Sequence, residues 1–312
     1  MVLLPSVVAA QARAGAPLDV HAFDYERSIP AGDSGLVAVR LDAAVLAHSS
    51  RSDLRVATGD GRQIPYLLDR LEAPLVVRLA APQRIGGTSV VERMGGTRAG
   101  ARSRYRIRLP YAGLPEGELV LRTSERVFDR RLTLVMEEPP VSSDEPRRAG
   151  GERVIASAEW RNANPDSAPP ELRVALPPLR TAELLLIVEE GDNPPLSIVA
   201  PTLELPAYRL RFFRLPHQEL TLLYGQPSLD APRYDLALIA ARLDTVPARE
   251  VTLGPERQVP HVARHTPIVV FWSALVIAVT LLLVLLARLL HQGGSPADAS
   301  PPPSAGPPPS AD

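Results

Sequence analysis

The strongest constraint on this chain is an uninterrupted apolar run near its C-terminus, from Ile268 to Ala287. The run holds no charged residue, and its only clearly polar members are Ser273 and Thr280. Because an α-helix rises about 1.5 Å per residue, a run of this length crosses the roughly 30 Å hydrocarbon core of a bilayer. We therefore predict a transmembrane helix over residues 267–290, which makes a membrane the first expected partner.

The two ends of the chain predict its topology. Residues 1–16 hold a short apolar stretch followed by small residues, and they resemble a truncated or atypical signal peptide. With such a signal, the chain is a single-pass protein of the bacterial inner (plasma) membrane whose bulk is extracytoplasmic, in the periplasm. Residues 291–312, rich in Pro and without core-forming side chains, are then a short, disordered cytoplasmic tail.

Composition excludes several kinds of chemistry. The chain has no Cys and no Lys, which removes disulfides, thiolate nucleophiles, zinc–thiolate sites and Schiff-base lysines. A formal net charge of −1 gives no reason to expect nucleic acid as a partner. The remaining residue types show no arrangement typical of an enzyme, so we predict no catalytic residue, no metal and no cofactor.

The region before the membrane segment alternates with a period of two, which indicates β-strands. Asp53–Leu68 is the clearest example, since apolar residues alternate on both sides of Gly59-Asp60-Gly61, as in a hairpin. The 34 Pro residues also disfavour a helical body. We predict a small N-terminal β domain with a glycine-rich connection over residues 17–101.

Residues 102–226 contain a longer series of short strands, which is typical of a jelly-roll β-sandwich. The run Leu184–Val188 is apolar on both faces, so we expect it in the centre of a sheet. Residues 227–266 contain several Pro residues and little periodicity, and we predict a Pro-rich stalk there. The predicted fold class is all-β, with two β-sandwich domains and one C-terminal transmembrane helix.

Two polar features are candidate ligand sites. Asp192 and Asn193 follow the predicted central strand, and oxygen-rich loops of this kind hold calcium in some jelly-roll lectins. This stretch lacks the alternating Asp spacing of a calcium loop, and Pro194-Pro195 after it indicates a tight turn as its main role.

The second feature is a series of alternating arginines, Arg104, Arg106 and Arg108, preceded by Arg102. A strand places these guanidinium groups on one face, where they can bind an anionic polysaccharide or lipid headgroups. The alternative is a solvated outer sheet face in a chain that uses Arg at every basic position.

Other motifs have structural interpretations. Gly32-Asp33-Ser34-Gly35 resembles the sequence around a serine-protease nucleophile, but too little chain precedes it to supply the rest of that site, so we interpret it as a turn. Trp160 alternates with Ala158, which places it in the core rather than on a sugar platform. The small residues Ala274 and Ala278 offer a helix-packing face in the membrane.

Several motifs in order along the chain resemble an uncharacterised bacterial family, domain of unknown function 3999. The motifs are Phe23–Arg27, Asp53–Val56, Gly61–Tyr66, Gly191–Leu196, Leu223–Gly225 and Ala231–Leu236. The resemblance implies an exported β-sandwich protein with a discoidin-like or galactose-binding-like jelly roll and one C-terminal helix. It implies no activity and no catalytic residues.

These observations favour a membrane-anchored, extracytoplasmic binding or interaction module at the cell envelope, without catalysis. Two alternatives stay open: an accessory structural subunit that contacts a polytopic membrane protein through its helix, and a carbohydrate-binding envelope protein. Sugar platforms rely on exposed aromatic rings, and only 4% of this chain is aromatic, which favours a protein partner over a glycan.

Overall fold

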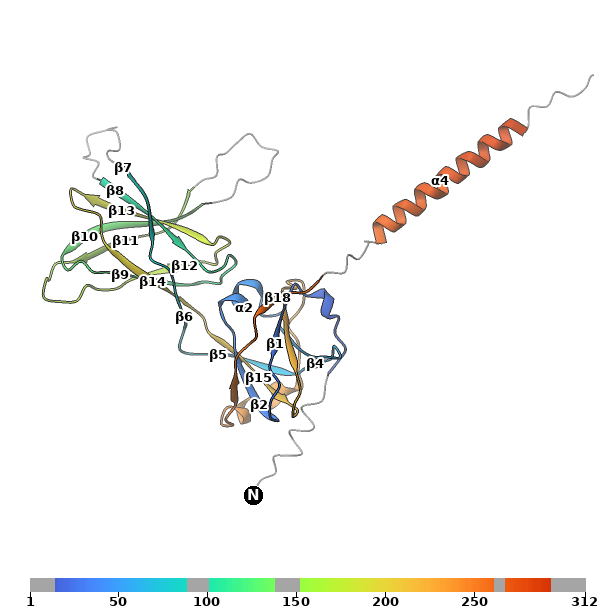
Figure 1. The fold of residues 1–312 in the computed structure, drawn as a ribbon, viewed down its shortest axis with the longest axis horizontal. Helices are drawn as coiled ribbons and strands as arrows, with labels where there is room; N and C mark the ends of the chain where they lie inside the picture. Colours follow the sequence, from blue (N-terminus) through green and yellow to red (C-terminus); the bar gives the residue numbers. More distant parts are fainter. Residues whose placement is uncertain (1–14, 89–100, 138–151, 261–266, 293–312) are drawn as a thin grey trace, which may run out of the picture. The chain divides into compact units, whose positions relative to one another are not determined.

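Short β-strands make up most of the chain in the computed structural model, which describes residues 15–88, 101–137, 152–260 and 267–292 (Figure 1). The described strands form four sheets, and their pairing is antiparallel except where β17 (Arg249–Val251) joins β2 (Gly35–Arg40). The all-β prediction is confirmed. Most of the predicted signal peptide, the glycine-rich stretch 89–100 and the tail 293–312 lie outside the described residues.

Two of the four sheets combine strands from both ends of the β region. The first has the order β18-β1-β16-β3-β4, and the second has the order β17-β2-β15-β5. We call residues 15–70 and 208–260, which supply these strands, the split lobe. Its remaining strands are β1 (Tyr25–Ile29), β3 (Arg55–Thr58), β4 (Gln63–Ile64), β5 (Tyr66–Arg70), β15 (Tyr208–Arg214), β16 (Leu220–Tyr224) and β18 (Glu256–Gln258).

The other two sheets come from the middle of the chain, residues 75–205, which we call the inserted lobe. The four-stranded sheet β12-β9-β14-β6 contains β6 (Leu75–Arg78), β9 (Gly117–Thr123), β12 (Leu172–Leu176) and β14 (Ile198–Leu205). The five-stranded sheet β11-β10-β13-β8-β7 contains β7 (Gln83–Thr88), β8 (Ala101–Arg108), β10 (Phe128–Glu137), β11 (Glu152–Asn162) and β13 (Glu183–Gly191).

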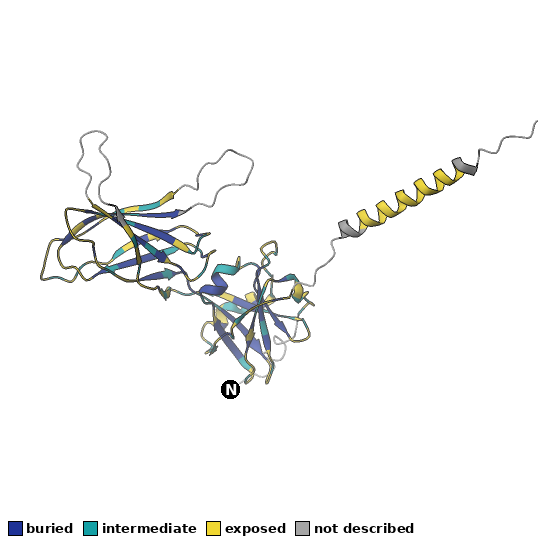
Figure 2. Ribbon diagram, turned by 45° about the horizontal axis from the view of Figure 1, so that its top comes forward, coloured by how far each residue is buried: buried dark blue, intermediate teal, exposed yellow. Residues whose placement is uncertain are grey.

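The two sheets of the inserted lobe face each other. Apolar side chains from both sheets line one narrow gap: Leu121, Leu132, Leu134, Ala156, Ala158, Leu172, Val174 and Leu186. Strand β13, which contains the run Leu184–Val188, lies third of five between β10 and β8, so its predicted central position is confirmed. Trp160 is only 2% exposed, as expected for a core residue. Figure 2 shows the buried positions concentrated where the sheets face each other.

The predicted hairpin at Asp53–Leu68 is present in a shorter form. Strand β3 pairs with β4, and Gly61 in the turn has a φ of 73°, which favours glycine. Beyond Pro65 the chain leaves this sheet, because β5 pairs with β15 in the second sheet of the split lobe. The predicted hairpin segment therefore supplies strands to two different sheets, β3 and β4 to one and β5 to the other.

The predicted division at residue 101 differs from the observed strand pairing. Strands β15 and β16, expected in the second domain, pair with β2, β5, β1 and β3 of the split lobe instead. Strand β6, expected in the first domain, pairs with β14 of the inserted lobe. Alternation identifies each strand but carries no information about its partner, so the insertion of one lobe within the other was not predicted.

Residues 227–260, expected as part of a stalk, belong to the split lobe. Strands β17 and β18 extend its two sheets by pairing with β2 and β1. Two short helices, η2 (Asp235–Ile239) and α3 (Ala240–Leu243), bury Leu236 and Leu243 with Leu36, Leu67 and Phe213. The split lobe also contains η1 (Val20–Ala22) and α2 (Ala43–His48), and Asp42 caps α2 by accepting a hydrogen bond from Val45 N at 3.2 Å.

Helix α4 (Pro267–Gln292) belongs to a unit separate from the β region. Within it, Phe271–Leu289 has a mean hydropathy of 2.3 and is long and apolar enough to cross a membrane. Its described side chains are exposed, which suits a lipid environment and not the core of a soluble domain (Figure 2). The helix begins at residue 267, where the apolar run predicted it.

Candidate functional site

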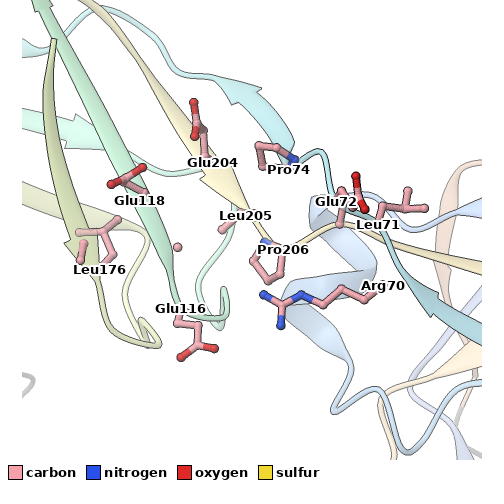
Figure 3. Close-up of a pocket in the computed structure, with 13 residues that line it drawn as sticks. Arg70, Leu71, Glu72, Pro74, Glu116, Glu118, Leu176, Glu204, Leu205 and Pro206 are labelled. Atoms are coloured by element: carbon pink, nitrogen blue, oxygen red, sulfur yellow. The ribbon is translucent and has the colours of Figure 1, made fainter.

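A groove of about 720 Å³ opens where the inserted lobe joins the split lobe (Figure 3). Its walls come from the segment after β5, the start of β9, the ends of β12 and β14, and the segment before β15. The charged lining residues are Arg70, Glu72, Glu116, Glu118 and Glu204, and Leu176, Leu205 and Pro206 provide an apolar floor. The groove therefore combines shape, apolar surface and an excess of carboxylates.

Two of these carboxylates already share one cationic partner. Arg173 on β12 contacts Glu118 at 2.7 Å and Glu204 at 2.9 Å, so one guanidinium bridges two neighbouring strands. Hydrogen bonds to Glu204 and Glu118 raise the pKa of Arg173 above its ordinary value. Within the described part of the chain, Glu72 and Glu116 have no ion-pair partner, and no group of three His, Asp or Glu could hold a metal ion. The groove can thus accept hydrogen bonds from a ligand at Glu72 and Glu116.

The predicted Asp192 and Asn193 site lies on the exposed turn between β13 and β14. Asn193 Nδ2 donates a hydrogen bond to the carbonyl oxygen of Glu190 at 3.0 Å, which is a turn contact. The groove lies at the other end of β14, beside Leu205, whereas the turn precedes Ile198 at its beginning. The turn and the groove are therefore separate surfaces.

Sequence reasoning missed the residue that orders this turn. Glu190 is buried and pairs with Arg130 on β10 at 2.8 Å, with side chains 1% and 8% exposed. The other oxygen of Glu190 accepts a hydrogen bond from Leu196 N at 3.1 Å, across the turn. The pair Glu189-Glu190 partly indicated a buried carboxylate, because alternation along β13 points one of the two side chains inward.

The predicted arginine face exists, but each of its four arginines already contacts one of three glutamates. Arg104 forms an ion pair with Glu152, while Arg106 and Arg108 contact Glu183 at 3.3 and 3.7 Å. Arg102 contacts Glu189 at 3.0 Å. The antiparallel register of β8 and β13 places Glu183 opposite Arg108 and Glu189 opposite Arg102, and Glu152 comes from β11, so the outer face is an Arg–Glu ladder. The ladder fits the solvated-face alternative given above.

A cluster of aromatic and titratable side chains on the split lobe was not predicted. His48 stacks on Tyr25 with ring centroids 4.4 Å apart, and its Nδ1 lies 3.0 Å from Glu256 Oε2. The same oxygen accepts a hydrogen bond from the Tyr224 hydroxyl at 2.7 Å. Burial is the main cause that raises the pKa of Tyr224 above its ordinary value, and the hydrogen bond to Glu256 is the second. Tyr111 of the inserted lobe meets the His48 ring edge-on at 5.4 Å.

The Gly32-Asp33-Ser34-Gly35 motif is an exposed turn, as interpreted from the sequence. The buried Arg214 organises it, donating hydrogen bonds to the carbonyl oxygens of Asp33 and Pro30. Gly32 packs so closely on this guanidinium that an added Cβ would lie 2.4 Å from its Nη2. These contacts account for the motif through folding.

Comparison with known proteins assigns no family. No family model matches the sequence, and no curated protein matches it. Among solved structures, Arthrobacter globiformis T6 isomalto-dextranse complexed with panose is 11% identical with a TM-score of 0.19, covering 63% of this chain. Dimeric latent PorU from Porphyromonas gingivalis is 12% identical with a TM-score of 0.16, covering 65% of this chain. The matches span 36% and 26% of those two chains, and at these TM-scores they support no conclusion about fold or activity.

Proposed function

We propose that this chain is a membrane-anchored binding module that presents its β lobes on the extracytoplasmic side of a bacterial inner membrane and recognises a protein partner without catalysing a reaction. The observation that carries the proposal is α4, an apolar helix of membrane-spanning length that directly follows a large β region. A helix of this kind confines the lobes to a membrane surface.

The finer features of the fold belong to the same proposal. Each pair of sheets is a β-sandwich, and the inserted lobe is a jelly roll of the galactose-binding-like type, as the resemblance to the domain of unknown function 3999 implies. Facing sheets with an apolar interior support this assignment. A signal peptide at residues 1–16 directs the lobes to the periplasm.

The groove is the preferred contact surface for the partner. It offers concave apolar surface with Glu72 and Glu116 available for hydrogen bonds, whereas the Arg–Glu ladder is occupied by its own ion pairs. Protein interfaces are defined by shape and a few well-placed polar groups, so a groove of this kind suits a protein partner.

Topology and binding can be tested in the full-length chain in its own membrane. Because the chain has no Cys, Asp166→Cys introduces one labelling site at an exposed loop. We expect a membrane-impermeant maleimide to label it in cells with a permeable outer membrane and an intact inner membrane. Labelling that requires lysis of the inner membrane would place the lobes in the cytoplasm and contradict the proposal.

A photo-crosslinking amino acid at Glu72 or Glu116 tests the groove, with the exposed Arg161 on β11 as the matched control. We expect a discrete crosslinked product from the groove positions and none from position 161. The same crosslinked products from all three positions, or no crosslinked product from positions 72 and 116, would show that the groove is not the contact surface. A glycan partner would instead give saturable binding on a glycan array.

The alternative, an accessory subunit held through α4, is favoured by one observation. Ala274 and Ala278 lie four residues apart on the apolar helix, so they share one face on which another helix can approach closely. Ala274→Leu with Ala278→Leu should abolish co-purification of a membrane partner. Val276→Leu with Val279→Leu, on other faces, should not. Unchanged co-purification in both variants would remove this alternative.

A further inference from the structure

The two lobes are joined by an irregular two-stranded ribbon. Arg70 pairs with Tyr208 in the split lobe, and Leu75 pairs with Leu205 in the inserted lobe. Between these pairs, residues 71–74 on one strand oppose only residues 206–207 on the other. Extra residues on one strand of an antiparallel pair form a bulge, which bends the strands and interrupts their hydrogen bonds.

Few hydrogen bonds stabilise this ribbon. Leu71 N donates to the carbonyl oxygen of Ala207 at 2.9 Å, while Pro74 and Pro206 have no N–H to donate. Packing against the ribbon is uneven, since residues 72–74 are exposed whereas Ala207 is buried. The 720 Å³ groove and a second groove of about 560 Å³ are both lined by Leu71, Glu72, Pro74 and Ala207, so space surrounds the ribbon. A thin bulged ribbon with open space around it can change its dihedral angles without disturbing a core.

A second contact between the lobes is made by residues outside the ribbon. The edge of Tyr111, on the connection between β8 and β9, meets the His48 ring at an interplanar angle of 79°. Gly113 follows it with a φ of 84°, and an added Cβ there would lie 2.5 Å from the carbonyl oxygen of Ala47. The connection thus rests directly on the C-terminal end of α2.

The two sides of this contact are held differently. In the split lobe, His48 is fixed by its stack on Tyr25 and its bond to Glu256. In the inserted lobe, Tyr111 is half-buried on a surface connection, and Gly113 N donates to the carbonyl oxygen of Leu179 at 2.8 Å. The interface is small: it consists of this aromatic edge contact, the close approach of Gly113 to Ala47, and the apolar side chains around them. It is weaker than a strand pair, so it can separate while both lobes stay folded.

We propose that residues 71–74 and 206–207 form a hinge, and that the contact between Tyr111 and His48 is a clasp that holds the two lobes in one relative position. Release of the clasp lets the inserted lobe rotate on the ribbon. Glu72 lies on the ribbon, whereas Glu118 and Glu204 lie on the inserted lobe, so rotation changes the spacing of the groove's carboxylates.

Distance measurements between paired spin labels on the full-length chain in detergent or nanodiscs test this proposal. The chain has no native Cys, so Asp60→Cys with Asp166→Cys reports on the two lobes, and Asp166→Cys with Asp192→Cys reports within the inserted lobe. With the clasp intact we expect one narrow distribution for the first pair. Tyr111→Ala should widen it by about twofold or more, as expected for released hinge motion. Tyr111→Phe, which keeps the ring, should leave it narrow.

His48→Ala removes the other half of the clasp from the other lobe and should give the same widening as Tyr111→Ala. His21→Ala, at an exposed position, is its matched control and should have no effect. The pair within the inserted lobe should keep its distribution in every variant, which shows that this lobe remains folded. An unchanged first pair in both Tyr111→Ala and His48→Ala would overturn the proposal, as would an equally broad distribution before any substitution.

Discussion

The carboxylate of Asp53 accepts a hydrogen bond from the backbone N–H of Gly225 at 2.9 Å, although the two residues are 172 positions apart in the chain. Asp53 is fully buried and also accepts hydrogen bonds from Gln226 N and Ser50 N at 2.9 and 3.0 Å. One side chain therefore connects the segment before β3 to the end of β16. The split lobe, which the inserted lobe divides in sequence, is held together by such polar contacts as well as by its sheets.

Replacement of Asp53 should destabilise the protein strongly. In Asp53→Ala, the buried N–H of Gly225 and the partly buried N–H groups of Gln226 and Ser50 lose their acceptor. An unsatisfied buried donor costs about 1–3 kcal/mol, and the two partly buried donors should cost less. Asp53→Asn retains one acceptor oxygen and should lose less. The free energy of unfolding, from denaturant titration of the full chain in detergent, measures both. Asp192→Asn, at an exposed turn, is the control and should change it by no more than about 0.5 kcal/mol. An equal loss of unfolding free energy in Asp53→Ala and in the control would contradict the role of Asp53 as a stabilising acceptor.

The buried and exposed ion pairs of β10 should respond differently to substitution. Glu190→Gln leaves Arg130 charged in the core without its partner, and loss of one member of a buried pair costs about 3–5 kcal/mol. Arg131 and Glu159 contact each other at 3.2 Å on the exposed face, where a pair contributes at most about 1 kcal/mol. Unfolding of Glu190→Gln and Glu159→Gln side by side tests this difference. A similar loss of unfolding free energy in both variants would show that burial of the ion pair does not determine how much its removal destabilises the protein.

The pKa of Asp33 gives a prediction in acid. The hydrogen bond and charge of Arg249 hold the pKa of Asp33 below its ordinary value of 3.8. The stabilisation from this pair is therefore present above the ordinary pKa and is lost as the pH falls through the lowered value. NMR titration of the Asp33 carboxyl carbon should show the low pKa, and Arg249→Gln should return it towards 3.8. A pKa that does not move in Arg249→Gln would exclude Arg249 as the cause.

The Arg–Glu ladder should contribute little to the binding of anions. Because Glu152 and Glu183 pair with Arg104, Arg106 and Arg108, they balance two of the three positive charges and weaken the field of the ladder. Replacement of all three arginines by Gln should change the affinity of the full chain for dextran sulfate by less than about threefold at physiological salt. The exposed set Arg62, Arg78 and Arg233 provides the matched triple control. A tenfold loss confined to the ladder variant would identify it as an anion site.

Alternation and hydropathy were sufficient for the local structure of this chain. They identified the strand that contains Leu184–Val188, the core position of Trp160 and the helix at Ile268–Ala287, because each depends on a pattern within a short window. They did not identify the pairing of β1 with β16. The register of that pair rests on matching two distant apolar faces, and many short strands in this chain have similar faces.

The polar interior was harder to predict for a related reason. Glu190 and Asp53 look like surface residues in the sequence, since carboxylates are rarely buried without partners. Their partners, Arg130 and the N–H groups of Gly225 and Gln226, come from other strands. The segments Asp53–Val56 and Leu223–Gly225, far apart in the sequence, therefore meet at this point.

The insertion of one lobe within the other also sets an order of events during synthesis. Strand β1 pairs with β16, about 190 residues later, so the first strands to leave the ribosome have no partners for most of translation. The inserted lobe is contiguous in sequence and has its own sheets, so it can fold as soon as β14 is complete. Until β15 and β16 are made, the edges of β1 and β2 are open to pairing with other chains. During synthesis, a chain of this topology therefore depends on rapid translation of β15 and β16, or on a factor that covers the edges of β1 and β2.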